Sequence, residues 1–126
     1  MCIFCNDITK EQIFYSSKYF NVVFDIDPEQ EGHVLLIAKD HYMNYLELPD
    51  EVVMDLIALE RKLIHIYENV LNIYGVSMIR NNGFVMDDGT HFHEHIIPRY
   101  KEDAFWSKEN TQHVSFDFDT FLQALQ

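Results

Sequence analysis

The stretch His91-Phe92-His93-Glu94-His95-Ile96-Ile97-Pro98-Arg99 brings three of the chain's seven histidines together at a spacing of two. Residues two apart on a β-strand point to the same face, so the three imidazoles would form one row. The β-branched pair Ile96 and Ile97 favours a strand, and Pro98 marks its end. A row of imidazoles can hold a metal, bind phosphate, or supply a nucleophile that is mostly neutral at pH 7.

The length and composition are those of one ordinary domain. The 126 residues include 48% hydrophobic and 14% aromatic side chains, so we expect residues 1–126 to fold as a single domain with a real core. No run approaches the roughly 18 apolar residues of a membrane span, and the N-terminus lacks the basic and apolar regions of a signal peptide. We therefore expect a cytoplasmic protein whose cysteines are thiols or metal ligands.

The formal net charge of −12 argues against one class of partner. Non-specific binding of DNA or RNA depends on Lys and Arg side chains that neutralise phosphates, so bulk nucleic acid is not expected as a partner. A small phosphate-containing ligand is compatible with this charge, provided that its pocket supplies hydrogen-bond donors locally.

Hydrophobic patterning predicts strands arranged around one long helix. The continuous apolar run His33-Val34-Leu35-Leu36-Ile37-Ala38 is typical of a central strand buried on both faces. A broad apolar stripe of helical period follows Pro49 and continues to Tyr74, which predicts a helix of about 37 Å with Gly75 as its C-terminal cap. Aromatic and β-branched runs between turn residues predict the other elements. These are strands over residues 12–16, 19–25, 76–80 and the histidine stretch, and a short helix over residues 117–125.

A C-x-x-C pair, Cys2-Ile3-Phe4-Cys5, stands near the N-terminus and allows three interpretations. The two cysteines can be small buried hydrophobic groups. A thioredoxin-like redox pair fits poorly, because that motif follows a strand and none precedes it here. The pair can also be half of a zinc site, which requires two further Cys or His ligands from elsewhere in the chain.

Several polar residues have a purely structural interpretation when each is taken alone. His33, at the start of the apolar run, can be a hydrogen-bonded histidine of the core. Asn81 can simply form a turn with the following Asn-Gly pair, and Asp87 and Asp88 can lie at a solvated loop tip. A functional interpretation of these residues depends on the combination of motifs.

Four segments, in this order, resemble the histidine triad (HIT) family of nucleotide hydrolases and transferases. The resemblance extends roughly from Cys2 to Tyr100. It implies an α+β, HIT-like fold with a mainly antiparallel sheet of about five strands and one long helix, usually paired as a homodimer. The segments are Cys2-Ile3-Phe4-Cys5, residues 23–28 followed by 32–41, Asn81-Asn82-Gly83, and the histidine stretch.

The resemblance implies a covalent mechanism centred on the middle histidine. His93 matches the nucleophile that attacks the α-phosphorus of a purine nucleotide and expels an amine, phosphate or nucleotide. Water then cleaves the nucleotidyl-histidine, a chemistry that suits neutral imidazole. His95 and His33 match histidines that donate hydrogen bonds to the phosphate or leaving group. Asn81 matches an asparagine near the leaving group, where a neutral donor stabilises developing charge.

The nucleotide-binding residues are implied in the same way. Asp25 matches the carboxylate that accepts both ribose hydroxyls. The apolar walls around the base match Ile3, Phe4, Phe24 and Ile26. The resemblance therefore implies that small purine nucleotides are the partners of this site.

Three features depart from the family pattern, and the first, Ala38 in place of the usual proline, is expected to have only a local effect on the backbone. The usual Gly-Gln-Ser-like phosphate loop is replaced by residues 84–90, in which Gly89 and Thr90 are expected to supply backbone or hydroxyl donors. Asp87 and Asp88 in the same loop repel anions, and we expect them to point away or to bind a cation. Glu94 stands where the family motif has an apolar residue, and a carboxylate facing the interior is costly unless it is paired or solvated.

A structural zinc site is also implied by the resemblance. Some family members hold zinc with the N-terminal C-x-x-C, the histidine after the central strand and the first histidine of the triad. Here these residues are Cys2, Cys5, His41 and His91, and a Cys₂His₂ set suits a closed tetrahedral site. His91 is therefore assigned to the metal, and catalysis is left to His93 with its partners.

Two other functions stay open. A metal-dependent hydrolase would use His91, His93, Glu94 and His95 as ligands of a catalytic metal, but the spacing lacks the extra residue of the common H-x-H-x-D-H pattern. A nucleotide-binding module of this fold with little catalysis is favoured by the acidic loop, and a fold resemblance does not by itself establish an activity.

Overall fold

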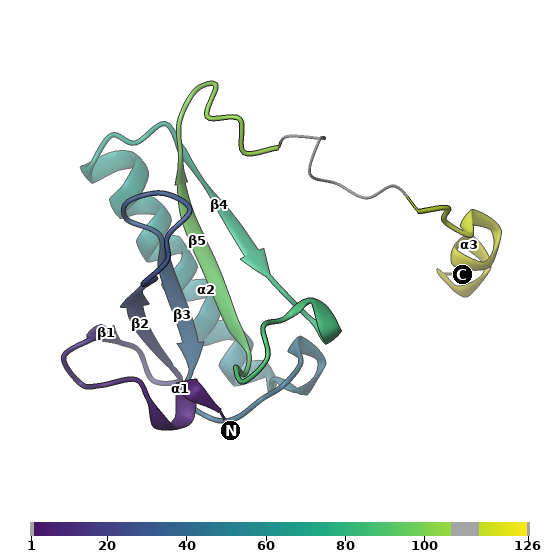
Figure 1. The fold of residues 1–126 in the computed structure, drawn as a ribbon, viewed down its shortest axis with the longest axis horizontal. Coiled ribbons are helices and arrows are strands. Elements are labelled where there is room, and N and C mark those ends of the chain that lie inside the picture. The colour runs from purple at the N-terminus through teal and green to yellow at the C-terminus, as the bar shows by residue number, and fades with distance from the viewer. Residues whose placement is uncertain (1, 107–113, 126) are drawn as a thin grey trace.

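The computed structural model describes residues 2–106 and 114–125. Its centre is a five-stranded sheet of order β1-β2-β3-β5-β4, in which all neighbouring strands are antiparallel (Figure 1). This sheet, with its single long helix, confirms the predicted fold class. The strands are β1 Ile13–Ser16, β2 Phe20–Phe24, β3 Val34–Ala38, β4 Gly75–Arg80 and β5 His93–Arg99, and the α-helices are α1 Ile3–Asn6, α2 Asp50–His65 and α3 Phe118–Leu125.

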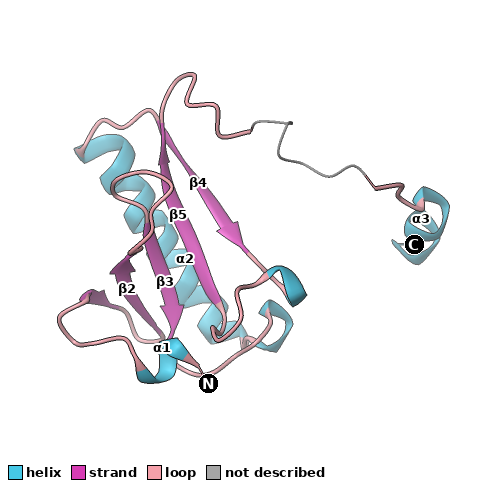
Figure 2. Cartoon of the chain, in the orientation of Figure 1, coloured by secondary structure: helices cyan, strands magenta, loops and turns pink. Residues whose placement is uncertain are grey.

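The two faces of the sheet carry different chemistry. His93 lies opposite Ile37 and His95 lies opposite Leu35 in the β3–β5 register, so these side chains share one face. Glu94 points to the other face, which α2 covers (Figure 2). The core between the sheet and α2 includes Phe20, Val22, Leu36, Val52, Leu56, Leu59 and Ile96.

Helix α2 is shorter than the apolar stripe predicts. It begins directly after Pro49, but its α-helical part ends at His65 and one wider, π-type turn, Ile66–Val70, follows it. Asn72 then adopts φ +56°, a left-handed conformation that asparagine tolerates better than most residues. Gly75 is the first residue of β4, so its prediction as a helix cap is wrong. Within the described residues, no helix has both the length and the apolar character needed to span a membrane.

The predicted row of three imidazoles is broken at its first member. Strand β5 begins at His93, and His91 precedes it. The backbone of Phe92 is held by the end of β3 and the segment that follows it, because Ala38 N–H donates to the Phe92 carbonyl at 3.2 Å and Phe92 N–H donates to the Tyr42 carbonyl at 2.6 Å. His91 is thereby fixed beside the segment after β3, while His93 continues onto the sheet.

Candidate functional site

The first group of functional side chains lies where the N-terminal segment meets the start of β5. Cys2 precedes the single turn of α1 and Cys5 lies within it. The Sγ atom of Cys2 is 3.2 Å from Nδ1 of His91. The Sγ atom of Cys5 is 3.2 Å from Nδ1 of His41 and 3.5 Å from Nδ1 of His91. Two thiols and two imidazole nitrogens therefore converge on one point.

This group fits a tetrahedral metal ion. Its four ligand atoms lie within 4.8 Å of one another, and the sulfur–nitrogen distances are close to the about 3.6 Å that zinc bond lengths imply. Nε2–H of His91 donates to the Ala38 carbonyl at 2.6 Å, which leaves the Nδ1 lone pair facing the thiols. Such a bond from the far ring nitrogen is typical of metal-binding histidines. All four predicted ligands are brought together: Cys2, Cys5, His41 and His91.

His93 presents the other ring nitrogen. Its Nδ1–H donates to the carbonyl oxygen of His91 at 2.8 Å, so Nε2 carries the lone pair. The side chain is 3% exposed, and this burial lowers the pKa of His93, which keeps the ring neutral at pH 7. The ring of Phe4 contacts it edge-on, with centroids 4.8 Å apart. A fixed, neutral imidazole with a free Nε2 is the form that nucleophilic catalysis requires.

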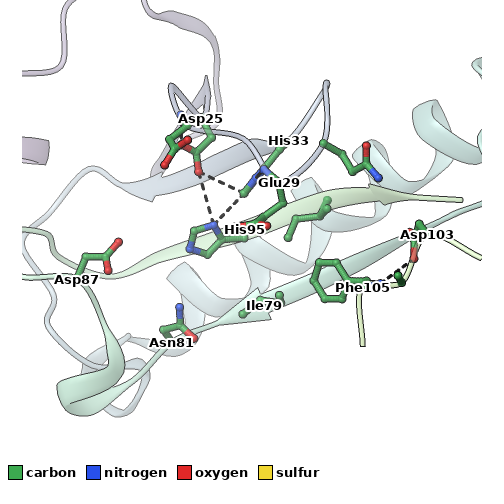
Figure 3. Close-up of a pocket in the computed structure, with 13 residues that line it drawn as sticks. Asp25, Glu29, His33, Ile79, Asn81, Asp87, His95, Asp103 and Phe105 are labelled. Atoms are coloured by element: carbon green, nitrogen blue, oxygen red, sulfur yellow. Dashed lines mark hydrogen bonds and ion pairs between the residues drawn. The ribbon is translucent and has the colours of Figure 1, made fainter. Parts of the chain in front are cut away.

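The loop between β2 and β3 sets the tautomer of His33. The backbone N–H of Glu29 donates to Nδ1 of His33 at 3.1 Å, so the ring proton must be on Nε2. This Nε2 lies 2.9 Å from Nδ1 of His95 and 3.4 Å from a carboxylate oxygen of Asp25 (Figure 3). Burial lowers the pKa of His33, in agreement with a neutral ring.

His95 consequently carries its own proton on the opposite nitrogen. Its Nδ1 faces the Nε2–H of His33 and accepts, so a neutral His95 ring has its proton on Nε2. Burial, followed by the neighbouring His33, lowers the pKa of His95. The ligand atoms of Asp25, His33 and His95 lie as close together as those of a metal site. The proton on Nε2 of His33 stands where a metal would bind, so we assign these residues to a hydrogen-bonded chain.

An apolar cavity of about 240 Å³ opens beside His93 and His95. Ile26 and Phe24 in its wall are 89% and 59% exposed, so these large apolar side chains are available to a ligand instead of filling the core. Asp25 lies in the same wall. The cavity thus gathers every predicted residue of the base and ribose site: Ile3, Phe4, Phe24, Asp25 and Ile26.

A second, larger cavity of about 600 Å³ shares Asp25, Asp87 and His95 with the first. Asn81 and His33 also line it, and Figure 3 shows Asp25 and Asn81 on opposite sides of His95. The four predicted catalytic residues therefore divide, because His93 lines only the apolar cavity and Asn81 and His33 line only the larger one. The acidic residues that complete the lining are Asp27, Glu29 and Asp103.

The loop of residues 84–90 is arranged differently from the expectation for a phosphate loop. The hydroxyl of Thr90 donates to the Asp87 carbonyl at 2.6 Å, so its proton is used within the loop. Gly89 lies outside the lining of both cavities, and its carbonyl accepts from the N–H of Ile3 at 2.6 Å. Asp87 lines both cavities and Asp88 lines the apolar one, so both acidic residues border the site.

Glu94 is buried on the α2 face and is paired there. Its carboxylate accepts from Nε of Arg80, and Nη2 of the same guanidinium donates to Glu60 at 2.5 Å. Burial and the neighbouring Glu60 raise the pKa of Glu94 to about 8, although Arg80 opposes the shift. Because Glu94 points away from the imidazoles, His91, His93, Glu94 and His95 do not converge on one metal ion.

Two contributors to the site were missed by sequence reasoning. Glu29 acts through its backbone N–H, which no residue pattern reveals. Asp103 reaches the larger cavity because the guanidinium of Arg99 donates twice to its carboxylate, both times at 2.6 Å, and folds residues 100–105 back over the end of β5. The Arg-x₃-Asp spacing was the only available signal, and it is a weak one outside a helix.

Comparison with known proteins places the chain in a family. A model of the HIT domain matches residues 7–102. A HIT-like protein of Methanocaldococcus jannaschii is 35% identical over 108 residues, which cover 82% of this chain and 83% of that protein. The adenosine 5′-monophosphoramidase HNT1 of Saccharomyces cerevisiae is 33% identical over 105 residues, 80% of this chain and 64% of that protein.

A solved structure supports the same assignment. The Zn-bound histidine triad family protein from Mycobacterium smegmatis superposes with a TM-score of 0.68 at 28% identity, covering 81% of this chain and 77% of that chain. The family match, the shared fold and the arrangement of His33, His93 and His95 agree with one another. The chain therefore belongs to the HIT domain family.

Proposed function

We propose that the protein is a nucleotide hydrolase or nucleotidyl transferase that cleaves the α-phosphate bond of small purine-nucleotide phosphoramidates, anhydrides or dinucleotides. The observation that carries this proposal is the tautomer of His93, whose Nδ1–H is held by the His91 carbonyl so that Nε2 is free beside the apolar cavity. The relationship to an adenosine 5′-monophosphoramidase of yeast supports the reaction class.

The proposed reaction has two steps. Nε2 of His93 attacks the α-phosphorus, and the bond to the leaving group breaks; a leaving nitrogen departs with the bonding electron pair and takes a proton from solvent. The Nε2–H of His95 stabilises the charge that develops there, as a fixed donor does in an oxyanion hole. Water then attacks the phosphorus and gives a proton to solvent while the bond between phosphorus and Nε2 breaks, which releases the nucleotide and returns His93 to its neutral form.

The test is amine release from adenosine 5′-phosphoramidate by the wild-type protein and by His93→Ala. We expect the variant to lose at least about a thousandfold in kcat, because no other nucleophile replaces Nε2. His65→Ala, which alters an exposed histidine of α2, serves as the matched control. Equal turnover by the wild type and His93→Ala would contradict the covalent role.

A nucleotide-binding module with little catalysis is the second candidate. The observation that favours it is the position of Asp87 and Asp88, whose charges repel a phosphate from the site. This candidate predicts that the wild type and His93→Ala are equally inactive while both still bind adenosine monophosphate. Calorimetric titration of both proteins with that nucleotide separates the two candidates.

We also propose that Cys2, Cys5, His41 and His91 hold a structural zinc ion, which would lock the N-terminal segment against the start of β5. The convergence of their ligand atoms and the Zn-bound relative support this proposal. Bound zinc would supply a cross-link and no step of the reaction. Protein purified with reduced thiols should contain about one equivalent of zinc, and less than about half an equivalent would count against the site.

Assembly and location complete the proposal. We propose a single cytoplasmic domain over residues 1–126 that forms a homodimer. The edge strand β4, with Met78 46% exposed, supports pairing, because an open strand edge can be covered by a second copy. Light scattering of the purified protein should give twice the mass of one chain, and the mass of a single chain would contradict the dimer.

A further inference from the structure

We propose that the larger cavity selects a positively charged leaving group, so that the preferred substrates are nucleoside phosphoramidates of amines that carry a second, protonated amino group. This inference rests on the proposed function and narrows it to one class of substrate. It predicts discrimination against phosphate, sulfate and nucleotide leaving groups.

The division of the catalytic residues places the leaving group in the larger cavity. The nucleophile His93 lines only the apolar cavity, where the nucleoside would bind. The larger cavity holds Asn81 and His33, and it meets the apolar cavity at His95, whose ring proton on Nε2 makes it a donor. An in-line displacement sends the leaving group away from the nucleophile, and the larger cavity is bordered by His95 but not by His93.

The charge of this cavity is negative and only partly compensated. Asp103 is neutralised by two hydrogen bonds from Arg99, and one oxygen of Asp25 accepts from the backbone N–H of Asp27. Glu29 and Asp87, like Asp27, have no cationic partner among the described residues, and the described lining contains neither Lys nor Arg. Their carboxylates are exposed, so they are free to meet a ligand.

These two carboxylates also act on the catalytic histidine. Glu29 and Asp87 oppose the lowering of the pKa of His95, which means that their negative charge acts on this histidine. Glu29 is anchored there by its own backbone N–H, which donates to His33. A leaving group in this position meets a field that attracts cations and repels anions.

Screening by solvent limits how strongly Glu29 and Asp87 can change the relative rates of charged leaving groups. Exposed charges a few ångströms apart interact weakly in water, so each carboxylate should change the relative rate of a charged leaving group by about three- to tenfold. Salt should reduce this preference, because the screening length falls from about 10 Å at 0.1 M to about 3 Å at 1 M.

Three adenosine 5′-phosphoramidates of similar length test the inference. They are made from 1,4-diaminobutane, butylamine and 4-aminobutyrate, so that the leaving chain carries a charge of plus one, zero or minus one at neutral pH. The wild type should show the highest kcat/KM for the cationic compound and the lowest for the anionic one. We expect a ratio of at least about tenfold between these two at low salt and a smaller ratio at 1 M salt.

The double variant Glu29→Gln, Asp87→Asn tests the named residues. It should reduce the cation-to-anion ratio to within about threefold, and the neutral compound serves as the internal reference for any general change in rate. Glu31→Gln, an exposed acid in the same loop that does not line the cavity, should leave the ratio unchanged.

Each remaining outcome overturns a different statement. Equal kcat/KM for all three compounds in the wild type overturns the charge selection and leaves the proposed function intact. A second outcome is a preference for the anionic compound that requires Mg²⁺ and is lost when a chelator is added. This result would mean that a metal cation occupies the carboxylates, and it would also overturn the charge selection. If even the neutral compound is not cleaved, the proposed function fails, and the inference fails with it.

Discussion

Two groups of imidazoles lie at the start of the same strand and have opposite chemistry. At one end His91 turns its Nδ1 toward two thiols, because its Nε2–H is bound by the Ala38 carbonyl. Two residues later His93 offers Nε2, because its Nδ1–H is bound by the His91 carbonyl. The role of each ring is therefore decided by the hydrogen bond that its other nitrogen makes.

The same rule separates a metal site from a hydrogen-bonded chain. Two clusters place three or more ligand atoms within 4.8 Å of one another, so proximity alone does not distinguish them. One is the set Cys2, Cys5, His41 and His91, and the other is the set Asp25, His33 and His95. The backbone N–H of Glu29 makes Nδ1 of His33 an acceptor and forces the proton onto Nε2. One backbone donor thus turns Asp25, His33 and His95 into a chain that ends in a donor at His95.

The largest effect should come from removing one ligand of the candidate zinc site while the catalytic histidines are left unchanged. Cys5→Ser removes one of four zinc ligands, so we expect loss of tightly bound zinc and a fall of at least about 3 kcal/mol in the free energy of unfolding. Turnover of the protein that stays folded should fall by less than about tenfold. Metal content, thermal unfolding and turnover of the folded fraction give the three readouts.

The control for that variant is the wild type treated with a strong chelator, which should reproduce the loss of stability. A Cys5→Ser protein that keeps a full equivalent of zinc would break the assignment of the ligands. If Cys5→Ser keeps its stability but loses all turnover, the candidate zinc site and the catalytic histidines are not independent of each other.

Substitution of the hydrogen-bonded histidines His33 and His95 should give the reverse pattern, a loss of turnover with little change in zinc content or stability. His95→Ala removes the donor to the leaving group, so we expect kcat to fall by about a hundredfold while zinc content and thermal stability stay close to the wild type. His33→Asn should lower kcat by less, about tenfold, because His33 acts through His95. Loss of zinc in His95→Ala would contradict the separation of the two clusters.

A smaller effect, on the pH dependence of stability, compares the two faces of β5. Burial lowers the pKa values of His33, His93 and His95, so the folded state binds fewer protons than the unfolded chain near and below pH 6.5. Because of these histidines, the protein should lose stability as the pH falls below 6.5.

The carboxylate of Glu94, on the other face of β5, has the opposite effect. Its pKa is raised from 4.5 to about 8, so the folded state binds more protons between these values, and stability should be lost as the pH rises through this window.

Glu94→Gln isolates the second effect. The amide can still accept from Arg80 but does not titrate, so the fall in stability between pH 6.5 and 8 should flatten by up to about 1 kcal/mol per pH unit. Urea unfolding at several pH values measures the slope, with Glu31→Gln as the control. An unchanged alkaline slope would mean that Glu94 is ionised throughout and that Arg80 alone neutralises it.

The sequence carried most of the fold because its signals are local. The buried run of β3 showed as continuous apolar residues, and the spacing of two put His93 and His95 on one face. The end of α2 was missed because the apolar stripe continues past it, whereas the chain is turned by the left-handed Asn72. The periodicity of apolar residues indicates which side chains face the core, but it does not indicate at which residue the helix ends.

The candidate site was predictable as a set of residues, but its arrangement was not. Motifs named the residues of both clusters, yet the proton position on His33 depends on a backbone N–H of Glu29. The pairing of Glu94 depends on Arg80 from the neighbouring strand and Glu60 from α2. These are contacts between distant parts of the chain, and one sequence contains no pattern that reports them.

The most direct measurement is to quench the reaction of the wild type with an adenosine 5′-phosphoramidate within milliseconds and to map the modified peptide by mass spectrometry. We expect an adenylyl group on Nε2 of His93, absent from His93→Ala and preserved in His65→Ala. An adenylyl group on any other residue, or full turnover without a covalent adduct at any time point, would contradict the assignment of His93 as the nucleophile.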